Sequence, residues 1–437
     1  MKEKPSAINI IWLSMIVLAT VTAAFTGKMD AVTKASFDSA KSAVTLAIGL
    51  VGPMALWLGI MKVAEAGGLL KIIARAVRPV MVRLFPDVPH DHPAMSAMIM
   101  NMAANALGLG NAATPMGIKA MQELDKLAAE KGTATNAMCL FLAINTSGVT
   151  LLPLGVITVR AAANAASPAA ILIPSILATL CSTLVAIAAA KILAGRDRFA
   201  VPAAVGGQTP ADGGQIAPAD GPGEELFRPG RAGRTYIWLL LAAFGVAMVY
   251  RLALNENGFS LSASTLNDLS GWLIPMLIAF FLIFGYLRGV KVYETITEGA
   301  KEGFTTAVRI IPFMVAIFVA IGMFRASGAM DLLILWLSPV TELVGMPAEA
   351  LAMALMRPLS GSGAFGIMSE MVSQAPDSFL AFLVSTMQGS TETTFYVLAV
   401  YFGSVGIKRT RHALPAALCA DAAGIAASVF ICNAWFG

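Results

Sequence analysis

The amino-acid sequence predicts an all-α polytopic membrane protein with about nine transmembrane helices and two re-entrant helical hairpins, arranged as an inverted repeat. Of the 437 residues, 57% are hydrophobic and only 13% are charged. Soluble domains usually carry about 25% charged residues. Several uncharged stretches reach the roughly 20 residues that a helix needs to cross a bilayer. The two halves of the chain also resemble each other, and this similarity predicts the repeat.

The predicted spans follow from these apolar stretches and from the lysines and arginines, which are enriched in cytoplasmic loops. The first stretch follows Lys2 and Lys4. A signal peptide cleaved near Ala23 is the alternative, but the stretch is longer than the apolar region of a signal peptide. The predicted orientation places the N-terminus in the cytoplasm. The predicted spans are 8–27, 42–61, 137–157, 168–194, 236–254, 269–287, 303–324, 378–402 and 413–435.

One segment between the two halves has too few large apolar residues to fold. Residues 201–234 contain eight glycines and five prolines, a composition typical of a flexible linker. Arginines flank the segment and favour a cytoplasmic location. We therefore predict a first membrane half at 1–195, a flexible cytoplasmic linker at 196–234 and a second membrane half at 235–437.

The internal similarity extends over about fifty residues without a gap. Placing residues 36–86 over 296–346 aligns Gly68 with Gly328. One additional span precedes the repeat in the second half, so the two copies are predicted to cross the membrane in opposite directions. Inverted repeats with broken helices near the midplane are the architecture of many secondary transporters. The alternative is a duplication that has been retained for packing alone.

The first predicted hairpin, 93–118, is uncharged, but basic loops precede and follow it. It is therefore predicted to enter and leave the membrane on the cytoplasmic side. It carries Asn101, Asn105, Asn111 and Thr114. Asparagine is costly in hydrocarbon unless its amide is hydrogen-bonded. These side chains either bind a ligand or an ion, or they form hydrogen bonds between closely packed helices.

The second predicted hairpin, 350–369, is rich in small residues and contains Arg357, Ser360 and Ser362. A guanidinium group suits a carboxylate or a phosphate, so Arg357 is a candidate ligand of an anionic solute. The alternatives are an ion pair with Glu370 or Glu392, or an extended side chain that reaches the membrane interface.

A third polar segment interrupts the apolar stretch 378–407. Residues 389–394 are all glycine, hydroxyl-bearing or acidic, a pattern that favours a break in the helix. Glu392 is a candidate proton carrier or cation ligand, because an intramembrane carboxylate is by default a functional hypothesis. Asp421, among small residues, is interpreted as packed and hydrogen-bonded. The candidate binding residues of the third segment and of its first-half counterpart are Gln388, Ser390, Thr391, Glu392, Asn145 and Thr146.

No pattern typical of an enzyme, a metal site or a cofactor site is present. The sequence has no Ser-His-Asp, Gly-x-Ser-x-Gly or phosphate-loop signature. Its four cysteines lack Cys-x-x-Cys spacing, and His90 and His92 lack further ligands. We therefore predict no enzyme, no cofactor and no metal, with H+ or Na+ as the coupling ion of transport. The expected partners are membrane lipid, a small-molecule solute and a second copy in a homodimer, but no nucleic acid.

The polar motifs resemble those of two known families. The sequence NMAANALGLGNAATP at 101–115 resembles spore maturation protein A. The sequences RPLSGSGA at 357–364, MQGSTETTFY at 387–396 and YFGSVGI at 401–407 resemble spore maturation protein B. The chain thus resembles a fusion of the two. Both belong to the nucleoside-recognition, or Gate-domain, group, which is similar to parts of concentrative nucleoside transporters and of the ferrous-iron permease.

The resemblance implies a transporter-like core in the bacterial inner membrane, but it implies no particular substrate. The leading hypothesis is a transporter of a small polar or anionic solute through a central site between the two repeats. The alternative is a non-transporting membrane partner that assembles with or regulates enzymes of the cell envelope.

Overall fold

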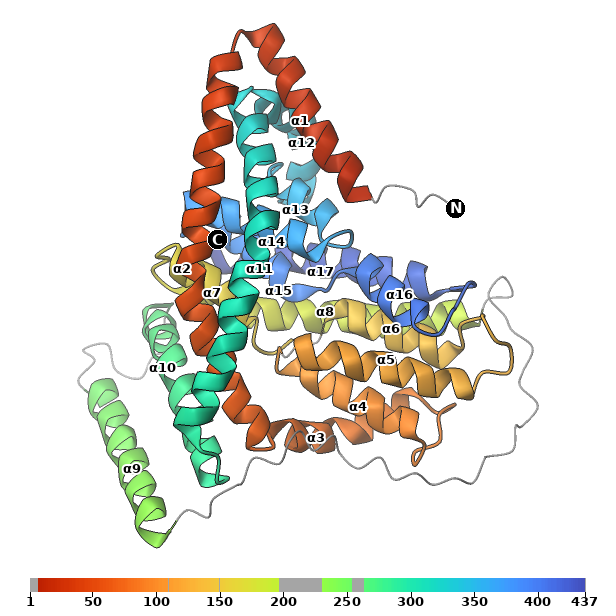
Figure 1. Ribbon diagram of the computed structural model, residues 1–437, viewed down its shortest axis with the longest axis vertical. Helices are drawn as coiled ribbons and strands as arrows, with labels where there is room; N and C mark the ends of the chain where they lie inside the picture. The colour runs from red at the N-terminus through yellow and green to blue at the C-terminus, as the bar shows by residue number, and fades with distance from the viewer. Residues whose placement is uncertain (1–6, 109, 149, 196–229, 254–262, 437) are drawn as a thin grey trace.

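The computed structural model describes residues 7–108, 110–148, 150–195, 230–253 and 263–436 (Figure 1). In these ranges the regular secondary structure is helical, and one isolated β-bridge joins Thr133 to Arg409. The first series of helices is α1 (Ala7–Thr26), α2 (Met29–Ala66), α3 (Leu69–Leu84), α4 (Pro93–Ala106), α5 (Gly110–Lys126), α6 (Asn136–Ser147), α7 (Leu154–Ala162), η1 (Pro168–Ile171) and α8 (Leu172–Ala194).

Two helices, α9 (Arg231–Ala253) and α10 (Ala263–Leu287), precede a second series that follows the order of the first. The second series is α11 (Val292–Ala326), α12 (Ala329–Thr341), η3 (Glu342–Val344), α13 (Ala350–Met356), α14 (Gly361–Gln374), α15 (Phe379–Ser390), α16 (Thr394–Gly403) and α17 (Ala413–Phe436). Each series contains a long helix, a shorter helix at its end, a helix pair, a broken helix and a final long helix.

Equivalent glycines end the long helix of each series. Gly68 follows α2 with φ = 81°, and Gly328 follows α11 with φ = 86°. Residues with a Cβ rarely adopt this left-handed conformation, so glycine permits the sharp turn into α3 and into α12. The alignment of these two glycines in the sequence therefore corresponds to the same turn in the structure.

Helices α2 and α11 lie side by side and run antiparallel (Figure 1). Gly303 of α11 faces Ala55 of α2, and Gly322 of α11 faces Ser39. Residue numbers thus rise along α11 while they fall along α2. A Cβ at Gly303 would lie 2.5 Å from the Cα of Ala55, so glycine sets the close approach of the two helices.

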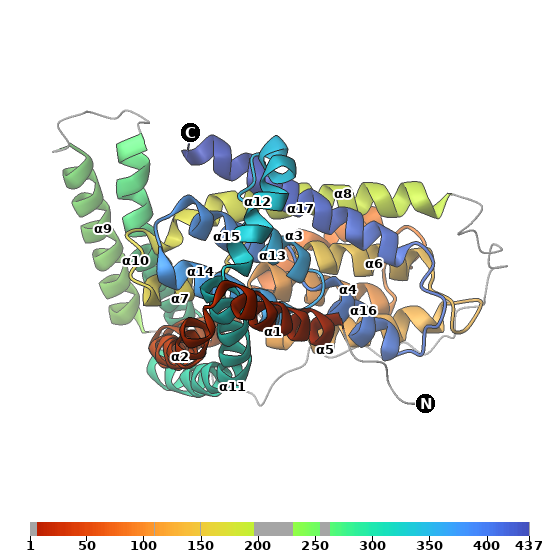
Figure 2. The ribbon, with the colours of Figure 1, turned by 90° about the horizontal axis from the view of Figure 1, so that it is seen from above.

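Helices α6 and α8 of the first series pack with α15 and α17 of the second. Helices α8 and α17 run antiparallel, as Figure 2 shows by the position of the C-terminus. The hydroxyl of Ser182 on α8 donates a 2.8 Å hydrogen bond to the carbonyl oxygen of Ala420 on α17. The two series therefore share one interface instead of forming separate cores.

Loops of one series also contact the other series, with the end of α7 taking part in one of the contacts. The N–H of Ala134 donates to the carbonyl oxygen of Arg409 at 3.0 Å. At a second contact, Arg160 donates to the carbonyl oxygen of Pro376 at 3.1 Å, and the N–H of Ala166 donates to the Asp377 carboxylate. Both contacts join residues more than 200 positions apart in the chain.

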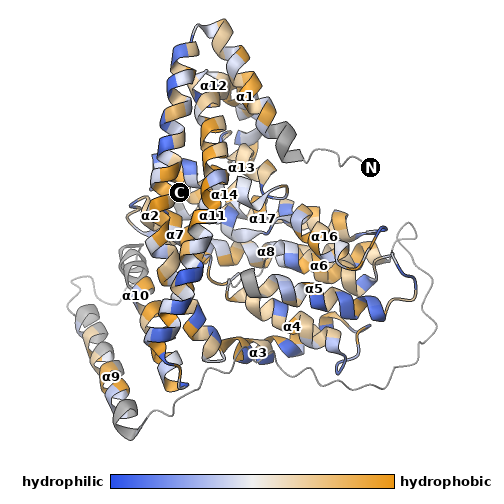
Figure 3. Ribbon diagram, viewed as in Figure 1, coloured by the Kyte–Doolittle hydropathy of each residue, from blue (hydrophilic) through white to orange (hydrophobic). Residues whose placement is uncertain are grey.

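Four of the described helical segments are long and apolar enough to cross a membrane, and shorter apolar stretches occur in α1, α6, α9, α10 and α12. The four are Met29–Ala66, Pro168–Ala194, Val292–Ala326 and Ala413–Trp435. The chain is therefore a helical, multi-pass membrane protein. Figure 3 shows hydrophobic residues along these helices and hydrophilic residues on α3.

Several predicted boundaries differ from the helices in the structure. The predicted spans 137–157 and 378–402 are not continuous, because α6 ends at Ser147 and α15 ends at Ser390. The predicted hairpins 93–118 and 350–369 correspond to the helix pairs α4–α5 and α13–α14. Most of the predicted linker, 196–234, lies outside the described residues, and its last four residues belong to α9.

Candidate functional site

The two broken helices end in different backbone conformations. Gly148 follows α6 with φ = 54°, and the next helix, α7, begins at Leu154. Thr391 follows α15 in an extended conformation, and α16 begins at Thr394. A helix end leaves its last carbonyl groups without intrahelical partners. Each break therefore offers backbone oxygens for other contacts.

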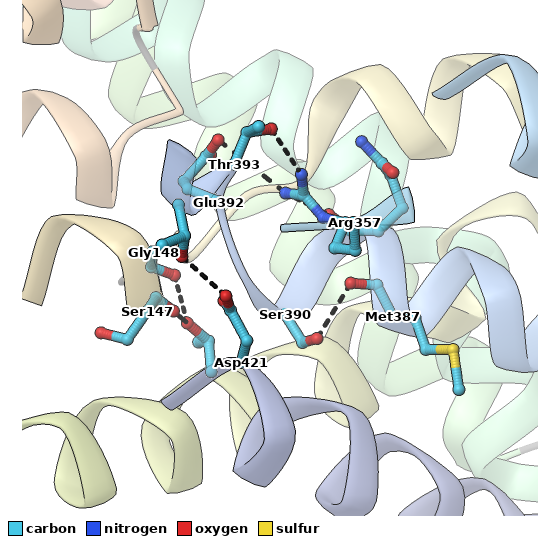
Figure 4. A network of polar contacts seen from close by, with 11 residues as sticks. Ser147, Gly148, Arg357, Met387, Ser390, Glu392, Thr393 and Asp421 are labelled. Carbon is cyan, nitrogen blue, oxygen red and sulfur yellow. Dashed lines mark hydrogen bonds and ion pairs between the residues drawn. The ribbon is translucent and has the colours of Figure 1, made fainter. Parts of the chain in front are cut away.

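The breaks of the two series meet directly, and we call their point of contact the crossing (Figure 4). The N–H of Glu392 donates a 2.8 Å hydrogen bond to the carbonyl oxygen of Thr146. A Cβ on Gly148 would lie 3.0 Å from Cγ of Glu392. The hydroxyl of Thr179 on α8 donates to the carbonyl oxygens of Ser147 and Gly148. The carbonyl groups that the end of α6 leaves without intrahelical partners thus accept hydrogen bonds from the second break and from α8.

Arg357 lies beside this crossing, directly after α13, with its side chain only 3% exposed. Its guanidinium donates to the hydroxyl of Thr393 at 3.2 Å and to the carbonyl oxygen of Gln388 at 3.3 Å. Nη2 lies 3.8 Å from Oε2 of Glu392, whose side chain is 50% exposed. The pairing with Glu392 that the sequence left as an alternative is therefore present.

Glu370, the other predicted partner of Arg357, pairs elsewhere. Its Oε1 lies 3.2 Å from Nη1 of Arg325, near the end of α11. Gln374 also contacts the Glu370 carboxylate. This pair links α11 to α14 and is separate from the crossing of the two breaks.

Two cavities adjoin the Arg357–Glu392 pair, with volumes of about 190 and about 270 Å³. Both are lined by Arg357, Phe365, Gln388 and Glu392. The smaller cavity extends along the first break, and the larger extends toward α11. The further lining residues of the smaller cavity include Asn105, Gly108, Thr150, Leu152 and Pro153, and those of the larger include Ile310, Phe313, Met314, Gly361 and Ser362.

A network of amide side chains adjoins the smaller cavity through Asn105. The amide of Asn101 donates to the hydroxyl of Tyr401 at 3.0 Å, and this hydroxyl donates to Oδ1 of Asn145 at 3.3 Å. Nδ2 of Asn105 donates to the same Oδ1 at 2.9 Å. The ring of Tyr401 stacks on Phe141, with 6.0 Å between the ring centroids. Tyr401 thus connects α16 of the second series to α4 and α6 of the first.

The structure brings five of the predicted binding residues to the cavity walls. These five are Asn105, Arg357, Ser362, Gln388 and Glu392. Two main-chain carbonyl groups also hold the site together: that of Thr146 accepts from the N–H of Glu392, and that of Gln388 accepts from Arg357.

The remaining predicted binding residues have other positions. Asn101 and Asn145 belong to the amide network, and the hydroxyl of Ser360 caps α14 by accepting from the N–H of Gly363 at 3.1 Å. Ser390 and Thr391 are buried, and Ser390 donates to the carbonyl oxygen of Met387. Thr114 lies on α5 and lines neither of the two cavities, and the side chain of Asn111 lies outside the described residues.

The sequence did not identify Tyr401 or Phe365 as members of this region. Tyr401 shares α16 with three other aromatic residues, and Phe365 is the one aromatic residue of α14, so neither pattern differs from that of a core residue. Asp421 is buried and accepts a 2.6 Å hydrogen bond from Thr394, as predicted.

Comparison with known proteins finds two matched regions in the chain. Residues 47–194 and 307–408 match the Gate family, described as nucleoside recognition. The chain is 49% identical over 180 residues to spore maturation protein A of Bacillus subtilis (strain 168). The aligned region is 41% of this chain and 92% of that protein. It is 46% identical over 173 residues to spore maturation protein B of the same organism. This aligned region is 39% of this chain and 97% of that protein.

Each of the two relatives is matched over nearly its full length, and each accounts for about 40% of this chain. This arrangement is consistent with a fusion of the two. The helical architecture, the apolar helices and the two matched regions agree: this chain belongs to the nucleoside-recognition, or Gate, family of membrane proteins.

Proposed function

We propose that this chain moves a small polar solute across the bacterial inner membrane, through a central site between two inverted repeats. The observation that carries the proposal is the 2.8 Å hydrogen bond between the breaks at Glu392 and Thr146, beside two cavities. Broken helices from two repeats that meet near the midplane form the solute sites of many secondary transporters. We assign the chain no catalytic step.

The antiparallel course of α2 and α11 supports the inverted arrangement. The helices that follow them differ in charge: α3 contains four basic residues and no acidic residue, whereas α12 and η3 contain Asp331 and Glu342 and no basic residue. Basic residues favour the cytoplasmic side. This charge difference supports a cytoplasmic α3 and an α12 on the opposite side, with the N-terminus and the linker also cytoplasmic.

The charges at the crossing narrow the class of solute. Arg357 is buried and pairs with Glu392, while the Glu392 carboxylate is half exposed beside both cavities. Asn105 and Gln388 add amide groups to the smaller cavity. A half-exposed carboxylate attracts hydrogen-bond donors and repels anions. We therefore favour a neutral polar solute with several donors over an anionic solute, with H+ or Na+ as the coupling ion.

Flux measurements in proteoliposomes test this function. The probes are labelled nucleosides, amino acids and dicarboxylates, measured with and without gradients of H+ and Na+. We expect flux of at least one neutral polar probe, reduced at least tenfold by Glu392→Gln and by Asn105→Ala. The control is Glu302→Gln, since Glu302 is exposed on α11 away from the cavities. Unchanged flux in both site variants, with normal folding, would exclude the central site.

A second function is favoured by the amide network. Asn101, Asn105 and Asn145 are hydrogen-bonded to one another through Tyr401 or directly, as expected of side chains that stabilise helix packing. If the asparagines serve helix packing alone, the chain is a non-transporting partner of cell-envelope enzymes. Deletion of residues 201–228 would then abolish co-purification with these enzymes, while Glu392→Gln would leave it unchanged.

A further inference from the structure

Asp421 is a buried carboxylate in the centre of α17, a helix long and apolar enough to cross a membrane. The residue is 2% exposed. Its Oδ2 accepts a 2.6 Å hydrogen bond from the hydroxyl of Thr394, while its Oδ1 is buried and forms no hydrogen bond within the described part of the chain. Half of this carboxylate is therefore unpartnered.

Within the described part of the chain, Asp421 also lacks the ionic partner that the other buried arginines and glutamates have. Among the described residues, no nitrogen of a lysine, arginine or histidine lies within 4.0 Å of its carboxylate. The other buried arginines and glutamates each have a partner of opposite charge within that distance. These pairs are Arg160–Asp377 at 4.0 Å, Arg325–Glu370 at 3.2 Å and Arg357–Glu392 at 3.8 Å.

The helices packed against α17 provide no further cation near Asp421. Helices α6, α15 and α16 contain no lysine, arginine, aspartate or glutamate, and Lys191 lies near the far end of α8. The nearby charged groups are Arg357 and Glu392 at the crossing of the breaks (Figure 4). The other titratable groups on these helices are Tyr396 and Tyr401 on α16, Cys139 on α6, Cys181 on α8, and Cys419 and Cys432 on α17 itself.

The charges in this region therefore sum to one uncompensated negative charge if Asp421 is ionised. Arg357 carries one positive charge, and Glu392 and Asp421 would carry two negative charges. An unpaired carboxylate in an apolar environment is unstable and becomes neutral by taking up a proton. A hard metal cation would need several oxygen ligands at once, whereas the hydrogen-bond partner of the Asp421 carboxylate among the described residues is a single hydroxyl.

We propose that Asp421 binds one proton on Oδ1 and is the carboxylate that couples transport to H+. Oδ2 then acts as the carbonyl oxygen of a carboxylic acid, which accepts the hydrogen bond from Thr394. The proton itself follows from the geometry, while its role in coupling rests on the proposed transport function. When a solute engages Glu392, Arg357 becomes available to Asp421, which then releases its proton.

Infrared spectroscopy of the purified full-length protein tests the proton directly, because a protonated carboxyl group has a carbonyl stretch that a carboxylate lacks. We expect this band at neutral pH in the wild type, its loss in Asp421→Asn, and its retention in Glu392→Gln and Glu370→Gln. Asparagine is isosteric with the protonated acid, so Asp421→Asn should fold normally. In Thr394→Val the band should move to higher frequency, because its carbonyl oxygen loses a hydrogen bond.

Retention of the band in Asp421→Asn would overturn the proposal. So would stabilisation of the wild type against heating by Na+ that is lost in Asp421→Asn, because this result would identify a sodium site instead. The infrared measurement requires no solute and no flux. If the infrared band does not depend on Asp421, the protonated carboxyl is rejected and the proposed transport function is unaffected. If the band is as expected but no flux is measured, the transport function is rejected and the protonated carboxyl is retained.

Coupling is tested by flux of any transported probe driven by a pH gradient. Asp421→Asn should reduce the gradient-driven flux at least tenfold. It should leave exchange of the probe at equal pH on both sides unchanged. Equal loss of both activities would contradict a coupling role for Asp421.

Discussion

The backbone N–H of Glu392 donates a 2.8 Å hydrogen bond to the carbonyl oxygen of Thr146, although the two residues lie in different halves of the chain. Thr146 is near the end of α6, and Glu392 follows α15. The contact fixes the two helix breaks against each other. It also holds the Glu392 side chain beside Arg357 and the two cavities.

Gly148→Ala should disturb this contact. Gly148 has φ = 54°, and a Cβ there would lie 3.0 Å from Cγ of Glu392. We expect a loss of about 1–2 kcal/mol in the free energy of unfolding from the backbone conformation alone. The control is Gly49→Ala in α2, where a Cβ would meet no atom within 4 Å. Unfolding in detergent is the measurement, and equal stability of the two variants would contradict the prediction.

Tyr401→Phe should weaken the contact between α16 and the first series. The hydroxyl bridges Asn101 and Asn145, but each amide retains another hydrogen bond, to Ala113 or from Asn105. We therefore expect a loss of only about 0.5–1.5 kcal/mol. Tyr396→Phe on the same helix is the control, because Tyr396 is 56% exposed. A comparable loss of thermal stability in both variants would count against the network.

Gly303→Ala should separate α2 from α11. A Cβ at Gly303 would lie 2.5 Å from the Cα of Ala55, and backbone atoms cannot move aside as a flexible side chain can. We expect a loss of about 1–3 kcal/mol, as for other overpacked interfaces. Gly52→Ala is the matched control, since a Cβ at that exposed position would meet no atom within 4 Å. The prediction fails if both variants unfold at the temperature of the wild type.

Stability should depend on pH through His92, whose Nδ1 accepts a 3.1 Å hydrogen bond from the N–H of Ala94 and caps α4. Burial lowers the pKa of His92 below its ordinary value of 6.5, Glu123 acts in the opposite direction, and Lys126 lowers the pKa further. The unfolded chain therefore takes up the proton first as the pH falls. The stabilisation is complete above pH 6.5 and is lost as the pH falls through the folded-state pKa.

His92→Asn should remove this part of the pH dependence, because asparagine caps a helix without titrating. The measurement is thermal unfolding in detergent at about pH 7.5 and about pH 5, on either side of the titration. The wild type should lose more stability between the two conditions than the variant. An identical loss in both proteins would show that the cap does not titrate in this range.

The sequence alone was sufficient for the main features that depend on local composition. Low charge and long apolar stretches predicted membrane helices. The polar residues 389–394 predicted a helix break that the structure has after Ser390. These predictions succeeded because solvation and backbone sterics act on each segment by itself.

The site could be predicted only in part. Asn105, Arg357, Gln388 and Glu392 were recognised because polar side chains are costly in an apolar segment. Tyr401 was not, because it is one of four aromatic residues in the apolar helix α16 and its position does not distinguish it from a core residue. The length of α2, which begins at Met29, was also missed, because its charged first turns lie outside the apolar stretch 42–61.

The sequence by itself determined which segments are apolar and that residues 389–394 break a helix, since these properties depend on neighbouring residues. Only the tertiary structure decided that Arg357 pairs with Glu392 instead of Glu370, that the break at Gly148 meets Glu392, and that no basic side chain of the described residues pairs with Asp421. Such pairings join residues that are far apart in the chain. They depend on how α2 packs against α11 and how α8 packs against α17, which no single segment encodes.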